Sequence, residues 1–455
     1  MAKRASSFQL TWKNPEAPVA IVNGCPMSHR FFLYQALKLA DSLPSNFQYA
    51  INLCENRFHF LLTFTALLIK NITSILPASK AHQSIIELTD EFSNCMIIGD
   101  KPNRFNDLVF INMTALTVDS IAPESSINTV SIDPDLLAVI AYTSGSTGRS
   151  KANHKYWWQL EASAHQALER FKLLSQPPAT LIATVPPQHM YGLETSIFYP
   201  LLGDNILFSG NTFFPEDLRL SIESAPSPCI LITTPVHLKS CMKSGLEWPK
   251  LDLIISATAA LDKTIALQAE ESFNCPVMEI FGSTETGAIA SRRTVNDTLW
   301  NLYDGIEILP HDKQYSAKIK GPQHNDWMLL SDSVEIIDQQ HFNLLGRHSD
   351  MVKIAGKRAS LADLTIKLNS IQGVQDGILF QDPRQESETS RLIALVVAPD
   401  LSSQHITQAL YQNVDPVFLP RPVIKVEQLP RNETGKIKKQ DILNIYFQQV
   451  HHASK

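Results

Sequence analysis

The chain has 455 residues, of which 44% are hydrophobic and 18% charged, with a formal net charge of -6. This length predicts more than one domain, and the composition is that of an ordinary globular protein. The charge balance excludes the broad basic excess of a nucleic-acid binder. The six cysteines form no CxxC pair or metal-ligand cluster, which favours a reduced, cytoplasmic compartment and argues against cysteine-bound zinc.

The N-terminal residues, MAKRASSFQL, carry positive charge without an apolar stretch behind them. We therefore do not expect a secretory signal. The most apolar run covers residues 60–69, which is too short to cross a bilayer. A buried helix is the better prediction for this run, and we expect no membrane span.

Short apolar runs typical of strands alternate with helical patterns over the first 300 residues. Strands are predicted over 50–54, 136–142, 181–185, 230–234 and 251–256, and a helix over 57–70. This alternation predicts an α/β fold built from βαβ units with parallel-type sheets. The short runs at 307–309, 317–320, 328–330 and 334–337 predict a small β subdomain. A mixed α+β segment is expected after Gly346, with strand-like runs at 378–380 and 392–398.

The charge distribution changes at the same place. Residues 350–455 carry a net charge of +2, and the rest of the chain carries -8. This difference is consistent with a basic carboxyl-terminal domain that faces phosphates or an acidic partner. Chance asymmetry between two domains explains it equally well.

The strongest local signal is the segment 142–151 (YTSGSTGRSK), which directly follows a predicted strand. Its glycines let the backbone approach a ligand, its hydroxyls can donate, and Arg149 and Lys151 add positive charge, which suits a polyphosphate. It is not a Walker loop, because Ser150 and Ala152 stand where Gly and Ser or Thr would be required. By composition alone, a surface turn is an equally good interpretation.

Three further segments carry candidate chemistry. Residues 279–287 (EIFGSTETG) combine an aromatic ring, hydroxyls and a carboxylate, and a lone Glu285 is adequate for magnesium on nucleotide phosphates. Residues 346–358 (GRHSDMVKIAGKR) are suited to grip ribose and phosphate. Residues 429–439 (LPRNETGKIKK) form a loop that ends in a lysine cluster. Taken alone, each segment also has a purely structural interpretation. In residues 279–287, Phe281 can be a core aromatic and Glu285 a solvated loop charge. Residues 346–358 can be a charged interdomain linker, and residues 429–439 a basic tail.

Together and in this order, the four segments resemble the adenylate-forming superfamily of acyl- and aryl-CoA ligases, luciferases and peptide-synthetase adenylation domains. The resemblance covers nearly the whole chain. Residues 186–192 (PPQHMYG) are similar to the family's Pro-x-x-His-x-x-Gly stretch. Residues 257–261 (ATAAL) stand where Gly-Gly-Ala-Pro-Leu is usual, and Ser331 and Asp332 stand at Thr-Gly-Asp.

The resemblance implies a nucleotide site. Phe281 would stack on adenine, and Asp332 and Arg347 would hold the ribose hydroxyls. Thr284 would contact the α-phosphate, and Glu285 would bind Mg²⁺. The phosphate loop would be formed by Thr143, Ser144, Gly145, Ser146, Thr147, Gly148 and Lys151.

The resemblance also implies a mobile carboxyl-terminal domain. Residues 1–346 would form the ATP- and acid-binding domain, 347–350 a hinge, and 351–455 a domain that carries the catalytic Lys436. Ser349 stands at a hinge position that is commonly Asp or Lys, with Asp350 next to it. Gly356 would line the thiol tunnel. His189 would border the acyl pocket, although a hydrogen-bonded core histidine is a real alternative.

The function implied is that of an ATP-dependent ligase, which adenylates a carboxylic acid and passes the acyl group to a thiol. ATP and Mg²⁺ would be the cofactors. Gly192 stands where peptide synthetases hold an amine with an acidic residue, and Glu194 is two places away, so we favour an aryl or fatty acid. The acceptor would be CoA or the pantetheine arm of an acyl carrier protein acting in trans. The alternative is a catalytically silent nucleotide- or partner-binding protein of this fold, against which Lys436, Thr284 and Glu285 argue.

Overall fold

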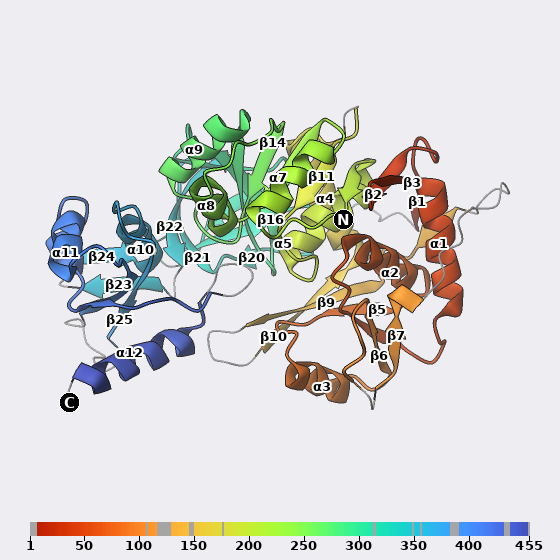
Figure 1. Ribbon diagram of the computed structural model, residues 1–455. Coiled ribbons are helices and arrows are strands. Elements are labelled where there is room, and N and C mark those ends of the chain that lie inside the picture. Colours follow the sequence, from red (N-terminus) through yellow and green to blue (C-terminus); the bar gives the residue numbers. More distant parts are fainter. Residues whose placement is uncertain are drawn as a thin grey trace.

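The computed structural model describes residues 7–105, 108–115, 129–144, 150–174, 177–312, 315–347, 350–354, 357–382, 391–431 and 437–453. Two large sheets and a carboxyl-terminal α+β part lie around a common centre (Figure 1). The predicted α/β class is therefore confirmed. No helix within these ranges has the length and apolar character that a bilayer crossing would need.

The first large sheet has six strands and is parallel except at β10. It contains the predicted strand at 50–54 and is accompanied by the first three helices. Its strands in spatial order are β10 (Ser150–Tyr156), β9 (Leu137–Ser144), β5 (Thr73–Leu76), β4 (Tyr49–Asn52), β6 (Cys95–Gly99) and β7 (Phe110–Asn112). The helices are α1 (His29–Ser42), α2 (Arg57–Ile69) and α3 (His82–Glu91).

Helix α2 confirms the prediction of a buried apolar helix. The Asn56 side chain caps its first turn by accepting from the amides of Phe58 and His59. The residues from Phe60 to Leu68 are all buried, because the helix is apolar on every side and packs within the core shared by the two large sheets.

The second large sheet has eleven strands, and its central strands β2, β12, β11, β13, β14 and β15 are parallel. Helices α7, α8 and α9 pack on one face (Figure 1), whereas α4 packs on the other. The strands in spatial order are β21 (Asp332–Ile336), β22 (His341–Arg347), β17 (Trp300–Leu302), β16 (Gly287–Arg293), β15 (Val277–Ser283), β14 (Leu253–Ser256), β13 (Cys229–Thr233), β11 (Thr180–Ala183), β12 (Ile206–Phe208), β2 (Pro18–Val22) and β3 (Cys25–Ser28). The helices are α4 (Trp157–Arg170), α5 (Met190–Leu193), a π-helix (Glu194–Phe198), α6 (Tyr199–Gly203), α7 (Pro215–Ser224), α8 (Pro235–Lys243) and α9 (Lys263–Phe273).

The small β subdomain is confirmed in part. Strands β18 (Glu307–Pro310), β19 (Ala317–Lys320) and β20 (Met328–Leu329) form a separate three-stranded sheet. The run predicted at 334–337 instead becomes β21, which pairs with β22 and extends the eleven-stranded sheet. Sequence could not separate these strands, because their spacing is similar and only long-range pairing distinguishes them. A further two-stranded sheet joins β1 (Phe8–Leu10) to β8 (Val130–Ile132).

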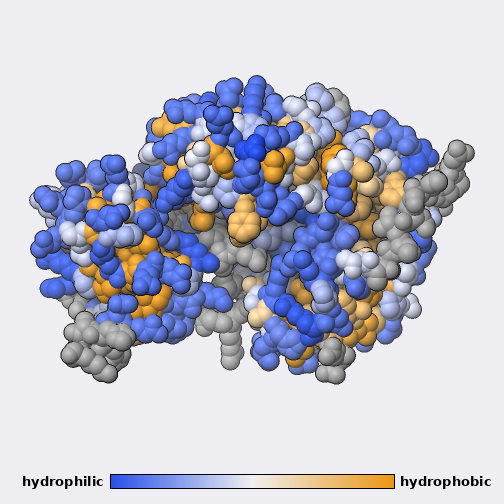
Figure 2. Space-filling model, in the orientation of Figure 1, coloured by the Kyte–Doolittle hydropathy of each residue, from blue (hydrophilic) through white to orange (hydrophobic). Residues whose placement is uncertain are grey.

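The carboxyl-terminal part begins just after β22, which ends at Arg347, and has hydrophobic clusters of its own. Figure 2 shows that its surface is mainly hydrophilic with an apolar area facing the viewer. Lys239 of α8 donates to the Gln375 carbonyl at 2.9 Å and so links the two parts. Its elements are β23 (Met351–Ile354), β24 (Lys357–Ser360), α10 (Leu361–Asn369), β25 (Asp376–Gln381), β26 (Leu392–Val397), α11 (Ser403–Tyr411), β27 (Val423–Lys425) and α12 (Lys439–Ala453), with 3-10 turns at Met113–Ala115 and Pro416–Phe418.

Candidate functional site

Three of the predicted site residues follow parallel strands of the eleven-stranded sheet. Strand β11 leads to His189, and β15 leads to Thr284 and Glu285. The carboxyl ends of parallel strands share one edge of a sheet, where ligands bind in open α/β folds. The topology therefore collects these candidates at a single edge.

Thr284 and Glu285 lie in a three-residue turn between β15 and β16. A Cβ atom on Gly282 would lie 2.2 Å from the Gly287 carbonyl oxygen, so the turn can close only with glycine there. The Ser283 amide donates to Thr286 Oγ1 at 3.1 Å, and the two hydroxyls lie 3.1 Å apart. The segment 279–287 thus folds as a tight turn that presents its central residues.

Two side chains from other elements hold this turn by its carbonyl groups. Lys155 Nζ donates to the Glu285 carbonyl oxygen at 2.6 Å. His324 Nε2 lies 2.9 Å from the Thr286 carbonyl oxygen, and since a carbonyl only accepts, that nitrogen carries the proton. Neither residue was predicted to belong to the site.

Glu194, the first residue of the π-helix, is also fully buried behind the turn. Its carboxylate accepts from Ser163 Oγ at 3.1 Å. Burial raises the pKa of Glu194 to about 7, although hydrogen bonds from Ser163 and the Ala288 amide and the charge of Lys155 act to lower it. Burial likewise lowers the pKa of Lys155 to about 8, against the attraction of Glu285 and Glu194. These opposite directions are expected for an acid and a base that leave water together.

Glu285 and Thr284 themselves remain half-exposed. A carboxylate with a neighbouring hydroxyl is a set of hard oxygen ligands of the kind that Mg²⁺ prefers when it also retains waters and binds nucleotide phosphates. The residues present therefore fit the predicted magnesium role.

Phe281 lies at the end of β15 with one part of its ring packed in the core. Its centroid lies 5.5 Å from that of Trp300 and 5.4 Å from that of Phe342. The side chain is only partly buried. This combines the two interpretations given for the residue, because the same ring that packs on the core also retains accessible surface.

Asp332 and Arg347 lie directly opposite each other on neighbouring antiparallel strands. Asp332 begins β21, Arg347 ends β22, and the strand register pairs the two. The sequence placed them 15 positions apart, and the register brings them to one place, as a shared ribose-binding role requires.

Thr143 and Lys151 pair across the hairpin formed by β9 and β10, on either side of the predicted phosphate loop. The Asn153 amide donates to the carbonyls of Ala141 and Lys151 at 3.2 and 3.3 Å, which fixes the base of this hairpin. Ser144 is the last residue of β9. The loop residues Gly145, Ser146, Thr147 and Gly148 lie outside the described residues, as do Ser349, Gly356 and Lys436.

His189 is half-exposed and forms the N-cap of α5. The following Gly192 has a packing role, since a Cβ there would lie 2.0 Å from the Pro186 carbonyl oxygen. This explains the Pro-x-x-His-x-x-Gly spacing, because the helix closes back on the first proline. Gln188, next to His189, donates to the Cys54 carbonyl at 2.6 Å and ties this loop to the six-stranded sheet.

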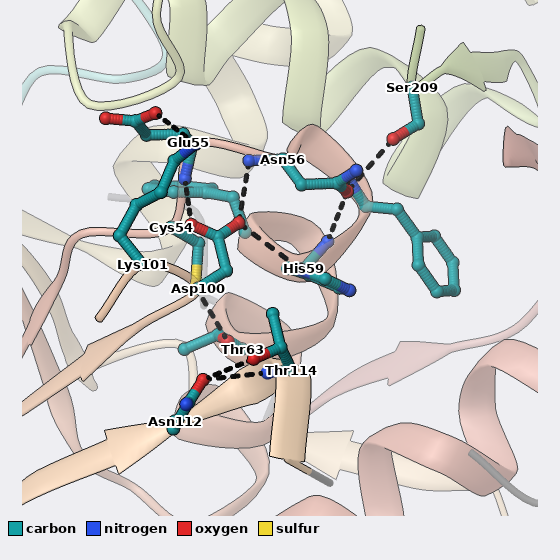
Figure 3. Close-up of polar contacts among 12 residues, drawn as sticks. Cys54, Glu55, Asn56, His59, Thr63, Asp100, Lys101, Asn112, Thr114 and Ser209 are labelled. Atoms are coloured by element: carbon teal, nitrogen blue, oxygen red, sulfur yellow. Dashed lines mark hydrogen bonds and ion pairs between the residues drawn. The ribbon is translucent and has the colours of Figure 1, made fainter. Parts of the chain in front are cut away.

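A polar junction, formed by Asp100, His59, Asn56 and Ser209, joins the two large sheets near the same loop (Figure 3). The Asp100 carboxylate accepts from the Glu55 and Asn56 amides at 2.9 and 2.8 Å, and it lies 3.2 Å from His59 Nδ1. Ser209 Oγ donates to Asn56 Oδ1 at 2.9 Å. Burial alone would raise the pKa of Asp100, but these hydrogen bonds hold it below its ordinary value.

Asp350 is half-buried just before β23. It lies between the last strand of the large sheet and the first strand of the carboxyl-terminal part. It is one of the residues of the predicted hinge segment 347–350, and rotation about this segment stays a prediction.

The sequence is similar to several characterised ligases. It is 25% identical over 307 residues to a 4-coumarate–CoA ligase of Halorhodospira halophila, covering 65% of this chain and 74% of that protein. It is 24% identical over 349 residues to a 3-hydroxybenzoate–CoA ligase of Aromatoleum sp. (strain CIB), covering 67% and 66%. An oxalate–CoA ligase of Arabidopsis thaliana is 20% identical over 452 residues, covering 87% of each.

The fold is that of solved adenylate-forming enzymes. ATP-bound MatB from Rhodopseudomonas palustris superposes with a TM-score of 0.81 at 18% identity, covering 96% of this chain and 97% of that one. MenE from Bacillus subtilis, in complex with ATP and a magnesium ion, superposes with a TM-score of 0.80 at 18% identity, covering 94% and 97%. The sequence pattern of the AMP-binding enzymes matches residues 39–340. This protein therefore belongs to the AMP-binding enzyme family, as the ordered motifs predicted.

Proposed function

We propose that this protein is an ATP-dependent acid–thiol ligase, which adenylates an aryl or fatty carboxylic acid and transfers the acyl group to a pantetheine thiol. The proposal goes beyond family membership in assigning the substrate class and the roles of individual residues. The contact between Lys155 and the Glu285 carbonyl carries it. This contact joins the hairpin that holds the predicted phosphate loop to the turn that holds the predicted magnesium ligand, although the two segments are 130 positions apart.

The first half-reaction requires two like charges to approach each other. The substrate carboxylate attacks the α-phosphate of ATP, a new oxygen–phosphorus bond forms, and pyrophosphate leaves. Magnesium held by Glu285 would supply positive charge to the phosphates. We assign Thr284 to the α-phosphate, Lys436 to the charge that develops during attack, and Asp332 and Arg347 to the ribose.

The second half-reaction requires a thiol but no protein nucleophile. AMP is a good leaving group, so a thiolate can attack the acyl carbon of the mixed anhydride directly, forming the thioester and releasing AMP. The carboxyl-terminal part would have to turn about residues 347–350 to exchange Lys436 for a thiol path beside Gly356. The domain limits 1–346 and 351–455 are proposed on this basis.

Two contacts favour an acid without an α-amine. Gly192 leaves no room for the acidic side chain that an amine would need, because even a Cβ would clash with the Pro186 carbonyl. The nearby Glu194 is buried and already accepts a hydrogen bond from Ser163. Neither position is therefore available to a substrate amine, which supports an aryl or fatty acid.

The acceptor is CoA or a carrier-protein pantetheine. The similar proteins mentioned above are named as CoA ligases, which supports CoA as the acceptor of the acyl group. A carrier protein acting in trans is the second acceptor to test, and the cytoplasmic location is a further proposal that follows from the cysteine pattern.

Pyrophosphate release with ATP, Mg²⁺ and a panel of aryl, fatty and amino acids tests the proposal. Each acid is measured alone, with CoA, and with a phosphopantetheinylated carrier protein, and thioester is quantified separately. Release with an aryl or fatty acid, followed by thioester formation, is expected. ATP binding without release for any acid would instead support a catalytically silent nucleotide-binding protein.

A further inference from the structure

We propose that Lys155 is a positioning residue, which fixes the orientation of the Thr284–Glu285 turn and so holds the magnesium ligand in register with the hairpin formed by β9 and β10. This inference rests on the proposed function, because it takes Glu285 as the magnesium ligand. It adds a residue that lies outside the four motifs and whose side chain reaches the site only through the backbone of another residue.

The contact is short and well protected from solvent. Lys155 lies near the end of β10 and is 8% exposed, and its Nζ lies 2.6 Å from the Glu285 carbonyl oxygen. A hydrogen bond from a charged donor to a carbonyl is about twice as strong as one between neutral groups. Exclusion of water strengthens it further, because the local dielectric constant is low.

Burying a lysine is unfavourable unless its charge is compensated. Here the compensation comes from the Glu285 carbonyl and from the negative charges of Glu194 and Glu285. A space-filling role alone would be met by an apolar side chain of similar length, without the desolvation cost. The retained charge therefore indicates that the interaction with the turn is the function of this side chain.

The carbonyl that Lys155 holds belongs to the predicted magnesium ligand. Fixing the Glu285 carbonyl fixes the peptide plane between Glu285 and Thr286, and with it the direction in which the Glu285 side chain leaves the backbone. The next carbonyl, of Thr286, is held by His324. With two consecutive carbonyls held, the turn cannot rotate, while the Glu285 carboxylate stays half-exposed.

The same contact joins the turn to the hairpin formed by β9 and β10. Lys151 and Lys155 lie on one strand, and Lys151 pairs with Thr143 across the hairpin. Any shift of the hairpin relative to the turn would break the Lys155 contact. The hairpin and the proposed metal ligand are thus held relative to each other, and a misplacement of about 1 Å in such a site can reduce the rate about a hundredfold.

The test compares Lys155→Met with Lys155→Gln. Both side chains end one bond short of the ammonium position, but Met has no donor and Gln ends in an uncharged amide nitrogen. Lys250→Met is the matched control, because Lys250 is exposed. ATP binding is measured by calorimetry with Mg²⁺ and with EDTA, and the Mg²⁺ dependence of pyrophosphate exchange is measured beside it. Thermal unfolding reports whether each variant is folded.

Both Lys155 variants are expected to raise the half-saturating Mg²⁺ concentration and to reduce the Mg²⁺-dependent gain in ATP affinity by about 10-fold or more, the usual range for residues that orient metal ligands. ATP affinity in EDTA should change by less than about 2-fold, since Lys155 is proposed to act through the metal ligand. Lys155→Gln keeps a polar group in the cavity, so it carries the test if Lys155→Met does not fold.

An unchanged Mg²⁺ dependence in a folded Lys155 variant would overturn the inference and leave the proposed function intact. Equal loss of ATP affinity with and without Mg²⁺ would also overturn it, because it would indicate a general structural role. If the parent protein shows no acid-dependent exchange, the proposed function fails instead. The calorimetric comparison still decides the role of Lys155 in that case.

Discussion

Two polar clusters lie near the same edge of the large sheet, and they differ in the groups that their hydrogen bonds join. In the junction cluster, the Asp100 carboxylate receives donors from Glu55, Asn56 and His59 (Figure 3). These hydrogen bonds all join the carboxylate to groups of the protein. In the cluster behind the turn, Lys155 and His324 bind backbone carbonyls, and the side chains of Thr284 and Glu285 stay half-exposed.

The difference indicates that the junction cluster holds two elements together, whereas the turn cluster orients the residues of the turn. The junction cluster fixes the first turn of α2 against Ser209 and the large sheet, so its loss should affect stability. The turn cluster orients Thr284 and Glu285, whose side chains are proposed to bind the nucleotide phosphate and the metal ion, so its loss should affect activity. Variants in and around the two clusters test this distinction.

The largest effect is expected outside both clusters, at Lys436. Lys436→Ala removes a charge that acts mainly while the α-phosphate is attacked, so adenylation should fall by about two to three orders of magnitude. Thioester formation from supplied acyl-AMP should be nearly retained. The check is a paired assay of both half-reactions, with Lys438→Ala as control, and equal loss in the two halves would reject the assignment.

Glu285→Gln should have the next largest effect. The change keeps the size of the side chain and removes the anionic ligand, so activity at limiting Mg²⁺ should fall by about 10- to 100-fold. The unfolding midpoint should stay within a degree or two of the parent value, because the backbone contacts of the turn are preserved. Unchanged activity across a Mg²⁺ titration would show that Glu285 is not the ligand.

Ser349→Pro tests the predicted hinge. Proline fixes φ, so thiol transfer should fall by about tenfold while pyrophosphate exchange largely survives. Asp350→Ala should produce a weaker defect of the same kind. The measurement is thioester yield beside pyrophosphate exchange for each variant. Transfer at the parent rate in Ser349→Pro would contradict a two-conformation cycle for this protein.

Asp100→Asn should affect stability rather than chemistry. It weakens three hydrogen bonds to a buried carboxylate and should lower the free energy of unfolding by about 1–3 kcal/mol. Because the pKa of Asp100 is held below its ordinary value, the contribution of its charge is present above that value and is lost as the pH falls through the lower, folded-state pKa.

The stability gap between parent and Asp100→Asn should therefore narrow as the pH is lowered through the acid range. Denaturant unfolding at neutral and acid pH measures this gap, and pyrophosphate exchange well below the unfolding midpoint should match the parent. A large loss of exchange in a folded Asp100→Asn protein would show that the junction also positions the site.

The smallest effect is expected at Thr258, which follows β14 with a φ of 82°. A β-branched residue in this region stores about 1–3 kcal/mol of strain, whereas glycine adopts it freely but is more disordered in the unfolded chain, by about 1 kcal/mol. Thr258→Gly should leave the unfolding midpoint unchanged or slightly raised. Thr258→Val is the control, and a large destabilisation by glycine would mean that the hydroxyl contacts outweigh the strain.

Many helices and strands were predictable from the local hydrophobic pattern, because the buried strands and α2 are continuous apolar runs. The predicted helix over 57–70 became Arg57–Ile69, and the strands at 50–54 and 136–142 became β4 and β9 within a few residues. Membership of β21 in the large sheet depended on pairing with β22, which no local pattern specifies.

The candidate site was predicted from motifs, and its residues stay predictions. Asp332 and Arg347 were proposed from separate motifs, and the strand register places them opposite each other. Lys155 was missed, because β10 (SKANHKY) has no apolar alternation to show which residues face inward. The signal available was a lysine four places after the loop lysine on the same strand, and it gains meaning only once that strand is known to face the turn.

Direct detection of the acyl-AMP intermediate tests the central claim most directly. The protein is incubated with ATP, Mg²⁺ and each acid in the absence of any thiol, and the bound and free products are examined by mass spectrometry. An aryl- or fatty acyl-adenylate is expected together with pyrophosphate, and the adenylate should disappear when CoA or the carrier protein is added. Formation of ADP, or ATP binding with no adenylate for any acid, would contradict it.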